Sequence, residues 1–249
     1  MCELFGFSGR KSADLTDRLN TFFSHSDKNP HGWGIMYGGG IVKEPVNAGS
    51  STLLPLILKD LPPQKNMLAH IRYATVGSIM EENCHPFSGS DISGREWTMI
   101  HNGTIYSGKD TYKYYKTQLG ETDSERLFLS LIDTVNDALC KGLSSERERF
   151  STVNRFIACH APRNKLNLII FDGDLLYVHK NLKNTLSYKC GSDGVTVSTQ
   201  PLDHTDWAPF PVAQVIAFKD GREAYRGQCH KGVFVPTLEY ITALDAMNI

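Results

Sequence analysis

The second residue of the chain is a cysteine, and its place beside Met1 offers a chemistry that an internal cysteine lacks. A side chain this small permits removal of Met1, which would leave Cys2 with a free α-amino group. In model compounds that amine has a pKa of about 8, close to neutrality. It could accept the proton of its own thiol during attack on an amide and later protonate the leaving amine. Position alone also fits a simpler role, a small apolar residue in a buried strand.

An Asn-Gly pair further along the chain could supply what amide chemistry needs next, hydrogen-bond donors for a developing oxyanion. Asn102 carries a side-chain amide, and Gly103 offers a backbone N–H with room for close approach. Both residues follow an apolar run that predicts a strand ending at His101. Taken alone, the pair is equally typical of an ordinary tight turn.

Two charged residues of opposite sign could recognise an amino-acid substrate, which presents one carboxylate and one ammonium group. Arg72 ends a predicted strand, and a guanidinium suits a bidentate grip on a carboxylate. Asp123 lies in Thr-Asp-Ser-Glu at the predicted start of a helix and could pair with the ammonium. Alone, Arg72 could be a solvated strand end, and Asp123 could serve the first turn of its helix.

These motifs gain meaning from their succession. The chain opens with Met-Cys-Glu-Leu-Phe-Gly and ends this series with Thr-Asp-Ser-Glu. In that order, over nearly the whole chain, they resemble the glutaminase domain of the class II glutamine amidotransferases, and His-Gly-Trp-Gly resembles the single-domain branch of that N-terminal-nucleophile hydrolase superfamily. The motifs between are His-Gly-Trp-Gly at 31–34, Arg-Tyr-Ala-Thr at 72–75, Asn-Cys-His-Pro-Phe at 83–87 and His-Asn-Gly at 101–103.

The resemblance implies an α+β fold, a four-layer αββα sandwich of two antiparallel sheets flanked by helices. It also implies that Cys2 is the nucleophile and that Asn102 and Gly103 form the oxyanion hole. Arg72 would hold the α-carboxylate of glutamine, and Asp123 the α-ammonium group.

Other positions of the motifs carry weaker expectations. The resemblance implies supporting, substrate-side roles for Thr75 and His85. Trp33 could shape the pocket near the nucleophile or pack in the core, and the sequence does not decide between them. Gln200 departs from the family pattern, which usually has an acid there, so a charged role at that position is in doubt.

The pattern of elements fits such a layered fold. Strands come first, two consecutive helices follow, and strands close the chain, which favours antiparallel sheets over alternating βαβ units. We expect one domain over residues 1–249, since no linker or repeat divides them. Strands are predicted over 2–8, 32–37, 41–42, 67–73, 87–92, 96–101, 166–171, 175–179, 186–190, 195–199 and 212–218, and helices from Ser12 or Asp14 through Phe23, over 51–61, from Thr122 through Leu139 and over 146–159.

Composition narrows the classes of function. The net charge is −1, so nothing favours nucleic acid or an anionic membrane as a partner. No apolar run reaches the roughly 18 residues of a membrane span, and no leader opens the sequence, so a cytoplasmic location is expected. The six cysteines lack Cys-x-x-Cys spacing, so we expect reduced thiols, no metal and no cofactor.

Several alternatives stay open at this stage. The ammonia could pass to a separate synthase subunit, or the enzyme could cleave γ-glutamyl conjugates or peptides for their own sake; the sequence also leaves homo-oligomerisation open. A different class of function is a regulatory module that binds glutamine without catalysis. A papain-like enzyme would instead use Cys84, Cys159 or Cys229, each of which precedes a histidine.

Overall fold

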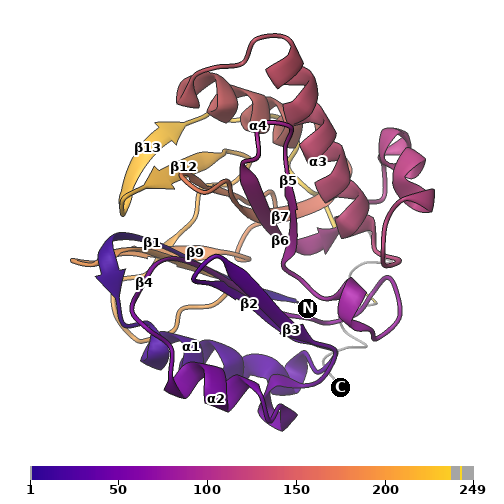
Figure 1. Ribbon diagram of the computed structural model, residues 1–249. Helices are drawn as coiled ribbons and strands as arrows, with labels where there is room; N and C mark the ends of the chain where they lie inside the picture. The colour runs from indigo at the N-terminus through magenta and orange to yellow at the C-terminus, as the bar shows by residue number, and fades with distance from the viewer. Residues whose placement is uncertain (1, 237–241, 243–249) are drawn as a thin grey trace.

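The computed structural model describes residues 2–236 and 242, arranged in four layers. Figure 1 shows two sheets stacked face to face, with α1 and α2 covering the outer face of one and α3 and α4 that of the other. The expected αββα architecture is confirmed. The helices are α1 (Thr16–Ser24), α2 (Leu54–Lys59), α3 (Asp123–Cys140) and α4 (Glu146–His160), with short 3₁₀ turns η1 (His25–Lys28), η2 (Ala48–Ser50), η3 (Glu81–Asn83) and η4 (Lys109–Lys116).

The first sheet, called sheet A, has seven antiparallel strands in the order β11-β9-β10-β1-β4-β2-β3. Its central strand β1 follows directly on Cys2, so the candidate nucleophile stands at the head of a strand held on both sides. Alternate residues of β1 face opposite layers: Phe5 and Phe7 pack toward α1, and Leu4 packs between the sheets. The strands are β1 (Glu3–Ala13), β2 (Trp33–Tyr37), β3 (Gly40–Glu44), β4 (Gln64–Ile71), β9 (Ser187–Cys190), β10 (Gly194–Ser198) and β11 (Ala208–Pro209).

The second sheet, sheet B, has six antiparallel strands in the order β13-β12-β8-β7-β6-β5. Strand β6 carries His101, Asn102 and Gly103 at its end, and β7 pairs with it so that Thr104 lies opposite Lys165. The strands are β5 (Phe87–Ser90), β6 (Glu96–Thr104), β7 (Lys165–Phe171), β8 (Leu176–His179), β12 (Ile216–Lys219) and β13 (Arg222–Arg226).

Three apolar clusters fill the spaces between the layers, as a four-layer fold requires. One lies between sheet A and its helices, one between the sheets, and one between sheet B and α3 with α4. The longer helices begin at side-chain caps: Thr122 accepts the backbone N–H of Glu125 at 3.2 Å, and Ser145 forms a capping box with Glu148. The cap at Thr122 fixes where Asp123 lies.

The sequence predictions of individual elements are confirmed with small shifts at their ends. Strand β6 runs on through Thr104, past the predicted end at His101, and β4 ends at Ile71, before the predicted Tyr73. The N-cap of α1 is Leu15 rather than the expected Ser12 or Asp14, although the Asp14 side chain accepts the backbone N–H of Thr16 at 2.9 Å. The short strand β11, the edge strand β13 and the 3₁₀ segment η4 were not predicted.

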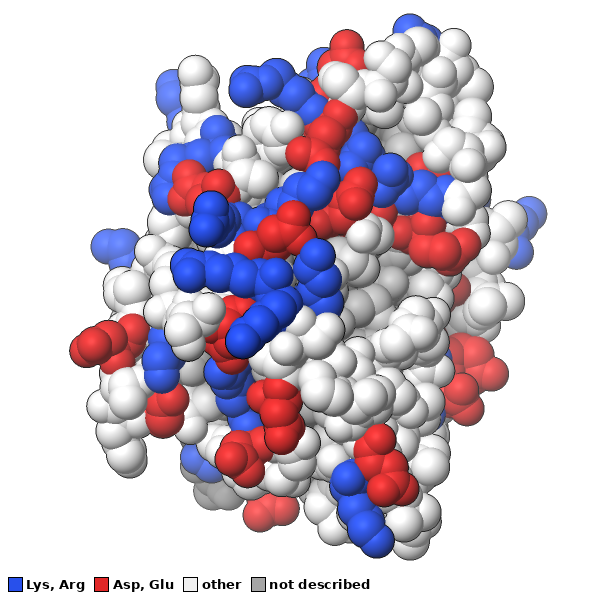
Figure 2. All heavy atoms as spheres, turned by 60° about the vertical axis from the view of Figure 1, so that its left-hand side comes forward, with Lys and Arg blue, Asp and Glu red and all other residues white. Residues whose placement is uncertain are grey.

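On the face drawn in Figure 2, basic and acidic side chains alternate in one band rather than separating into patches of one sign. Ion pairs between exposed side chains, such as Lys65 with Asp220 at 2.6 Å, match this mixture. Such pairs add little to stability in water. Among the helices within the described residues, none is long and apolar enough to span a bilayer.

Candidate active site

Cys2 directly precedes β1 and lies against the backbone of the segment that follows β4. Its Sγ accepts the backbone N–H of Tyr73 at 3.2 Å and lies 3.3 Å from the Tyr73 carbonyl oxygen. Burial raises the pKa of the thiol, while the Tyr73 N–H and the charges of Lys165 and Arg72 lower it. Burial outweighs these three groups, so the pKa of the Cys2 thiol stays above its ordinary value. Met1, whose removal is expected, lies outside the described residues.

Asn102 reaches from the end of β6 to the residue of the candidate nucleophile. Its Nδ2 donates to the carbonyl oxygen of Cys2 at 2.5 Å, and its Oδ1 accepts from Lys165 Nζ at 3.0 Å. A lysine ammonium only donates hydrogen bonds, so the oxygen of the amide must face Lys165 and its N–H groups must face Cys2. The amide has two N–H groups, so it can donate a second hydrogen bond beside the thiol.

Gly103 stands where β6 and β7 come closest. A Cβ at this position would overlap the carbonyl oxygen of Lys165 and the ring of His101. Only glycine, which has no Cβ, allows the end of β6 to lie this close to Lys165 on β7. This packing explains the glycine, and the expected N–H donation of Gly103 to an oxyanion stays a prediction.

Arg72 follows β4 and is buried, so it is not the solvated strand end that its position alone also allowed. Its guanidinium donates to the carbonyl oxygens of the following loop, from Nη1 to Ser78 at 3.0 Å and from Nη2 to Val76 and Gly77 at 3.1 and 3.2 Å. These contacts fold the loop around the cation. Thr75 lies in the same loop with an exposed side chain.

The segment of the protein that carries the His-Gly-Trp-Gly motif lies beside this loop and supports it. His31 donates its backbone N–H to the Arg72 carbonyl at 3.0 Å, and Arg72 donates to the Gly32 carbonyl at 2.7 Å. The ring of His31 accepts the backbone N–H of Ala74 at 2.9 Å. Trp33 itself is buried in the core under α1, beside Phe23, so its role is packing.

Asp123 begins α3 and is buried near the end of β6. Its Oδ2 accepts the backbone N–H of Ile105 at 2.7 Å. The adjacent Ser124 hydroxyl lies 2.9 Å from Nδ1 of His101, whose Nε2 lies 3.2 Å from the Lys165 carbonyl oxygen. Because a carbonyl only accepts, Nε2 carries the proton and Nδ1 accepts from Ser124. Asp123 is thus hydrogen-bonded to the residue that follows β6, the strand that carries Asn102. Strand β6 belongs to sheet B, whereas Cys2 heads the central strand of sheet A.

His85 lies behind the site in a group of buried imidazoles. Its ring lies tilted against the ring of His70 and edge-on to that of Phe87, with centroids 4.2 and 4.5 Å apart. Burial lowers the pKa of His70 to about 3 and that of His85 well below its ordinary value, so both rings are neutral at physiological pH. A Cβ at Gly34 would overlap the His85 carbonyl oxygen, which explains the second glycine of His-Gly-Trp-Gly. His85 is therefore a neutral, packed ring, and its expected supporting role on the substrate side stays a prediction.

Two polar residues near Cys2 escaped the sequence reasoning. Lys165 directly precedes the strand predicted over 166–171 and had no assigned role, yet its ammonium contacts Asn102 Oδ1 at 3.0 Å. Glu3 is buried and accepts from Gln200 Nε2 at 2.6 Å and from His25 Nδ1 at 2.8 Å. Gln200 stands where the family pattern expects an acid, and it donates a hydrogen bond to Glu3. An ionised acid at position 200 would instead repel the Glu3 carboxylate. The departure at Gln200 thus has a structural reason.

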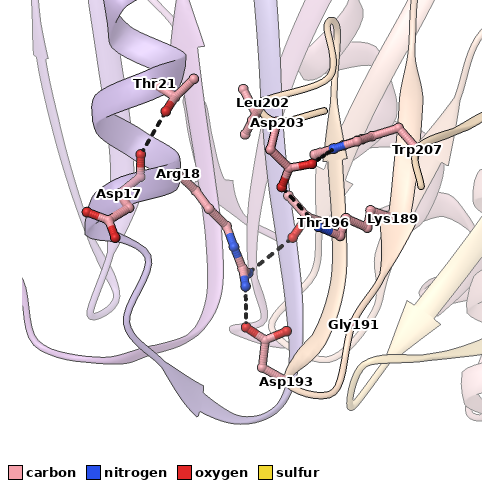
Figure 3. A pocket seen from close by; sticks show the side chains of 10 residues that line it. All are labelled: Asp17, Arg18, Thr21, Lys189, Gly191, Asp193, Thr196, Leu202, Asp203 and Trp207. Carbon is pink, nitrogen blue, oxygen red and sulfur yellow. Dashed lines mark hydrogen bonds and ion pairs between the residues drawn. The ribbon is translucent and has the colours of Figure 1, made fainter. Parts of the chain in front are cut away.

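A separate hollow of about 210 Å³ opens between α1 and the strands β9 and β10 (Figure 3). Arg18 reaches across it from α1 to Asp193 at 2.5 Å and to Thr196 at 3.2 Å. Lys189 pairs with Asp203 at 2.9 Å. These charges are engaged with each other, and none of the predicted site residues lines this hollow. Among the described residues, no group of three or more metal-binding side chains gathers anywhere.

Comparisons with known proteins bear on the whole chain. The sequence profile of the class II glutamine amidotransferases matches residues 1–192. An uncharacterized protein of Methanocaldococcus jannaschii is 27% identical over 258 residues, covering 90% of this chain and 71% of that protein. A Haemophilus influenzae protein named provisionally as a glutamine amidotransferase is 30% identical over 181 residues, covering 71% of this chain and 58% of its own length.

A solved structure supports the same fold. A crystal structure from Pseudomonas aeruginosa, described as a predicted glutamine amidotransferase, aligns with a TM-score of 0.63 and 21% identity. The match covers 90% of this chain and 100% of that one. At this identity the likeness shows a shared fold alone. Together with the profile match over most of the sequence, it leads to one conclusion: the chain belongs to the class II glutamine amidotransferase family.

Proposed function

We propose that this chain, after loss of Met1, hydrolyses the γ-amide bond of glutamine or of a γ-glutamyl amide through a thioester on Cys2. One observation carries the proposal: the Asn102 amide donates to the carbonyl of Cys2 at 2.5 Å, with its orientation fixed from behind by Lys165. An amide donor held against the backbone of Cys2 suits an acyl transfer, because the oxyanion forms beside the sulfur of that same residue. We also propose that residues 1–249 form one domain.

The proposed cycle uses two half-reactions. The Cys2 thiol gives its proton to its own α-amine, and the sulfur attacks the γ-carbonyl carbon. Asn102 and Gly103 donate to the oxyanion while the C–N bond breaks, and the leaving amine takes the proton from the α-ammonium group. Water then attacks the thioester and gives a proton back to the amine. The C–S bond breaks, glutamate leaves and the thiol is restored.

The substrate end that stays on the enzyme is the glutamyl group. Arg72 would bind its α-carboxylate with the N–H groups that remain beside the loop contacts, and Asp123 would bind its α-ammonium group. Two outcomes for the amine fit this arrangement, and glutamine is the first candidate substrate. Ammonia from glutamine could pass to a separate synthase, or a γ-glutamyl conjugate or peptide could be cleaved for its own products.

Trapping and turnover together test the proposal. Protein shown by intact mass to lack Met1 is incubated with diazo-oxo-norleucine, and the modified peptide is mapped. We expect one adduct on Cys2, and glutamate release from glutamine, a γ-glutamyl peptide or a γ-glutamyl thiol. Absence of both the adduct and glutamate release would instead favour a regulatory module that binds glutamine without catalysis.

Replacing Arg72 by lysine tests the grip on the carboxylate. A lysine keeps the positive charge but cannot hold three loop carbonyls and a carboxylate at once. We expect KM for the γ-glutamyl substrate to rise at least about tenfold, the scale of one lost charged hydrogen bond, with a smaller fall in kcat. Steady-state kinetics measures both. An unchanged KM would remove Arg72 from the substrate site.

A further inference from the structure

Lys165 is a buried cation beside the proposed nucleophile, and the proposed cycle gives it no step. It begins β7 and is 3% exposed. Its Nζ lies 3.0 Å from Asn102 Oδ1, and its own carbonyl oxygen accepts from His101 Nε2 at 3.2 Å. A buried ammonium costs free energy unless it is well paired. The strand therefore places a buried ammonium against the amide that faces Cys2.

We propose that Lys165 is a positioning residue of the oxyanion hole: its ammonium holds Oδ1 of Asn102, which turns the amide N–H groups toward the reacting carbonyl, and places a positive charge beside the Cys2 thiolate. The inference rests on the proposed hydrolysis for its catalytic part. Its electrostatic part concerns the thiol alone and can be measured without turnover.

The positioning argument follows from the chemistry of the two groups. An asparagine amide can rotate by half a turn, which would aim its oxygen at the nucleophile and repel a developing oxyanion. Lysine offers donors and no acceptor, so only one of the two orientations satisfies both groups. The same contact polarises the amide, because hydrogen bonds in a chain strengthen one another in a poorly solvated site. Lys165 thus makes Asn102 both better aimed and a better donor.

The electrostatic argument concerns the groups that face Lys165. Burial lowers the pKa of Lys165 to about 8, and the charge of Cys2 opposes that shift. His101 faces Lys165 from β6, and burial lowers its pKa, so this ring is neutral when Lys165 titrates. Arg72 acts on Cys2 from β4. The ammonium is present below about pH 8 and is lost above it, so its help to the thiolate fades as the pH rises.

The chain offers a matched control in Lys180. It is 1% exposed, burial lowers its pKa to about 8, and its Nζ donates to the Leu186 carbonyl at 2.9 Å. Removing either ammonium changes a buried cation to an apolar chain. Only Lys165 contacts Asn102 and acts on Cys2, so only its loss should alter the chemistry.

The experiment compares Lys165→Met, Lys165→Arg and Lys180→Met with the unchanged protein, all with Met1 removed. For Lys165→Met we expect kcat to fall about 10- to 100-fold with KM within a factor of about three, a smaller loss than removal of a donor itself. Cys2 alkylation by iodoacetamide at pH 7, where the Lys165 ammonium is present, should slow about tenfold. Lys165→Arg should restore part of both, and Lys180→Met should change neither, whatever its melting temperature.

The outcomes separate this inference from the proposed function. If the unchanged protein releases no glutamate, the hydrolysis is wrong, and the alkylation rates alone decide whether Lys165 acts on the thiol. If it is active and Lys165→Met matches Lys180→Met in kcat and in the rate of Cys2 alkylation at pH 7, Lys165 is merely structural and the inference is overturned.

Discussion

Replacing Cys2 by alanine is expected to lower γ-glutamyl hydrolysis by at least about 10⁴-fold, the scale seen when a covalent nucleophile is removed. The Sγ lies against the Tyr73 backbone, where the charges of Lys165 and Arg72 lower the pKa of the thiol. The side chain is small, so the fold should survive. Glutamate release, followed on protein whose mass shows loss of Met1, measures the effect, and thermal unfolding checks the fold.

The control for this variant is Cys159→Ala. Cys159 is exposed and precedes His160, so it represents the papain-like alternative that the sequence left open. Cys84 is a poorer rival, because burial raises the pKa of its thiol to about 11 and its Sγ faces backbone carbonyls. Full activity in Cys159→Ala is expected. Residual activity above about a tenth in Cys2→Ala would end the assignment of an N-terminal nucleophile.

The layers of the fold could be predicted because their elements carry strong local patterns. The apolar start of β1 and the helical spacing along α3 each match one period, and Thr122 marks a helix start. Strand β13 escaped because it is an edge strand with mostly exposed charged residues, which leaves no alternation to find. Segment η4 escaped because its tyrosines and lysines follow neither period. Its anchor is a tertiary contact, Tyr114 Oη to Asp133 at 2.6 Å.

The candidate site residues that lie in sequence motifs could be predicted from the sequence. Cys2, Arg72 and Asn102 each stand in a recognisable motif, and the fold brings the last two to the neighbourhood of the first. Lys165 has no such signal, because its partner lies 63 residues away on the paired strand. A lysine at the start of a strand is usually solvated, so only the register of β6 and β7 shows that it points inward. Long-range pairing is the part of a site that local sequence does not encode.

Asn102→Ala is expected to lower kcat by about 10²–10³-fold, the usual loss for one oxyanion donor. KM should change little, because the proposed contacts of the glutamyl end lie at Arg72 and Asp123. The change also removes an acceptor of the Lys165 ammonium, so a lower melting temperature is expected alongside the kinetic loss. Steady-state kinetics and thermal unfolding measure the two effects separately.

Asn102→Asp separates catalysis from stability at the same position. An aspartate keeps an oxygen for Lys165 Nζ, which lies 3.0 Å from the amide oxygen, but it offers the oxyanion no donor while ionised. We therefore expect it to regain melting temperature relative to the alanine variant while kcat stays at least as low. If instead either variant kept kcat within about threefold of the unchanged protein, the amide would not be an oxyanion donor, since such donors contribute far more. The contact with Cys2 would then be structural, and the proposed hydrolysis would lose the observation that carries it.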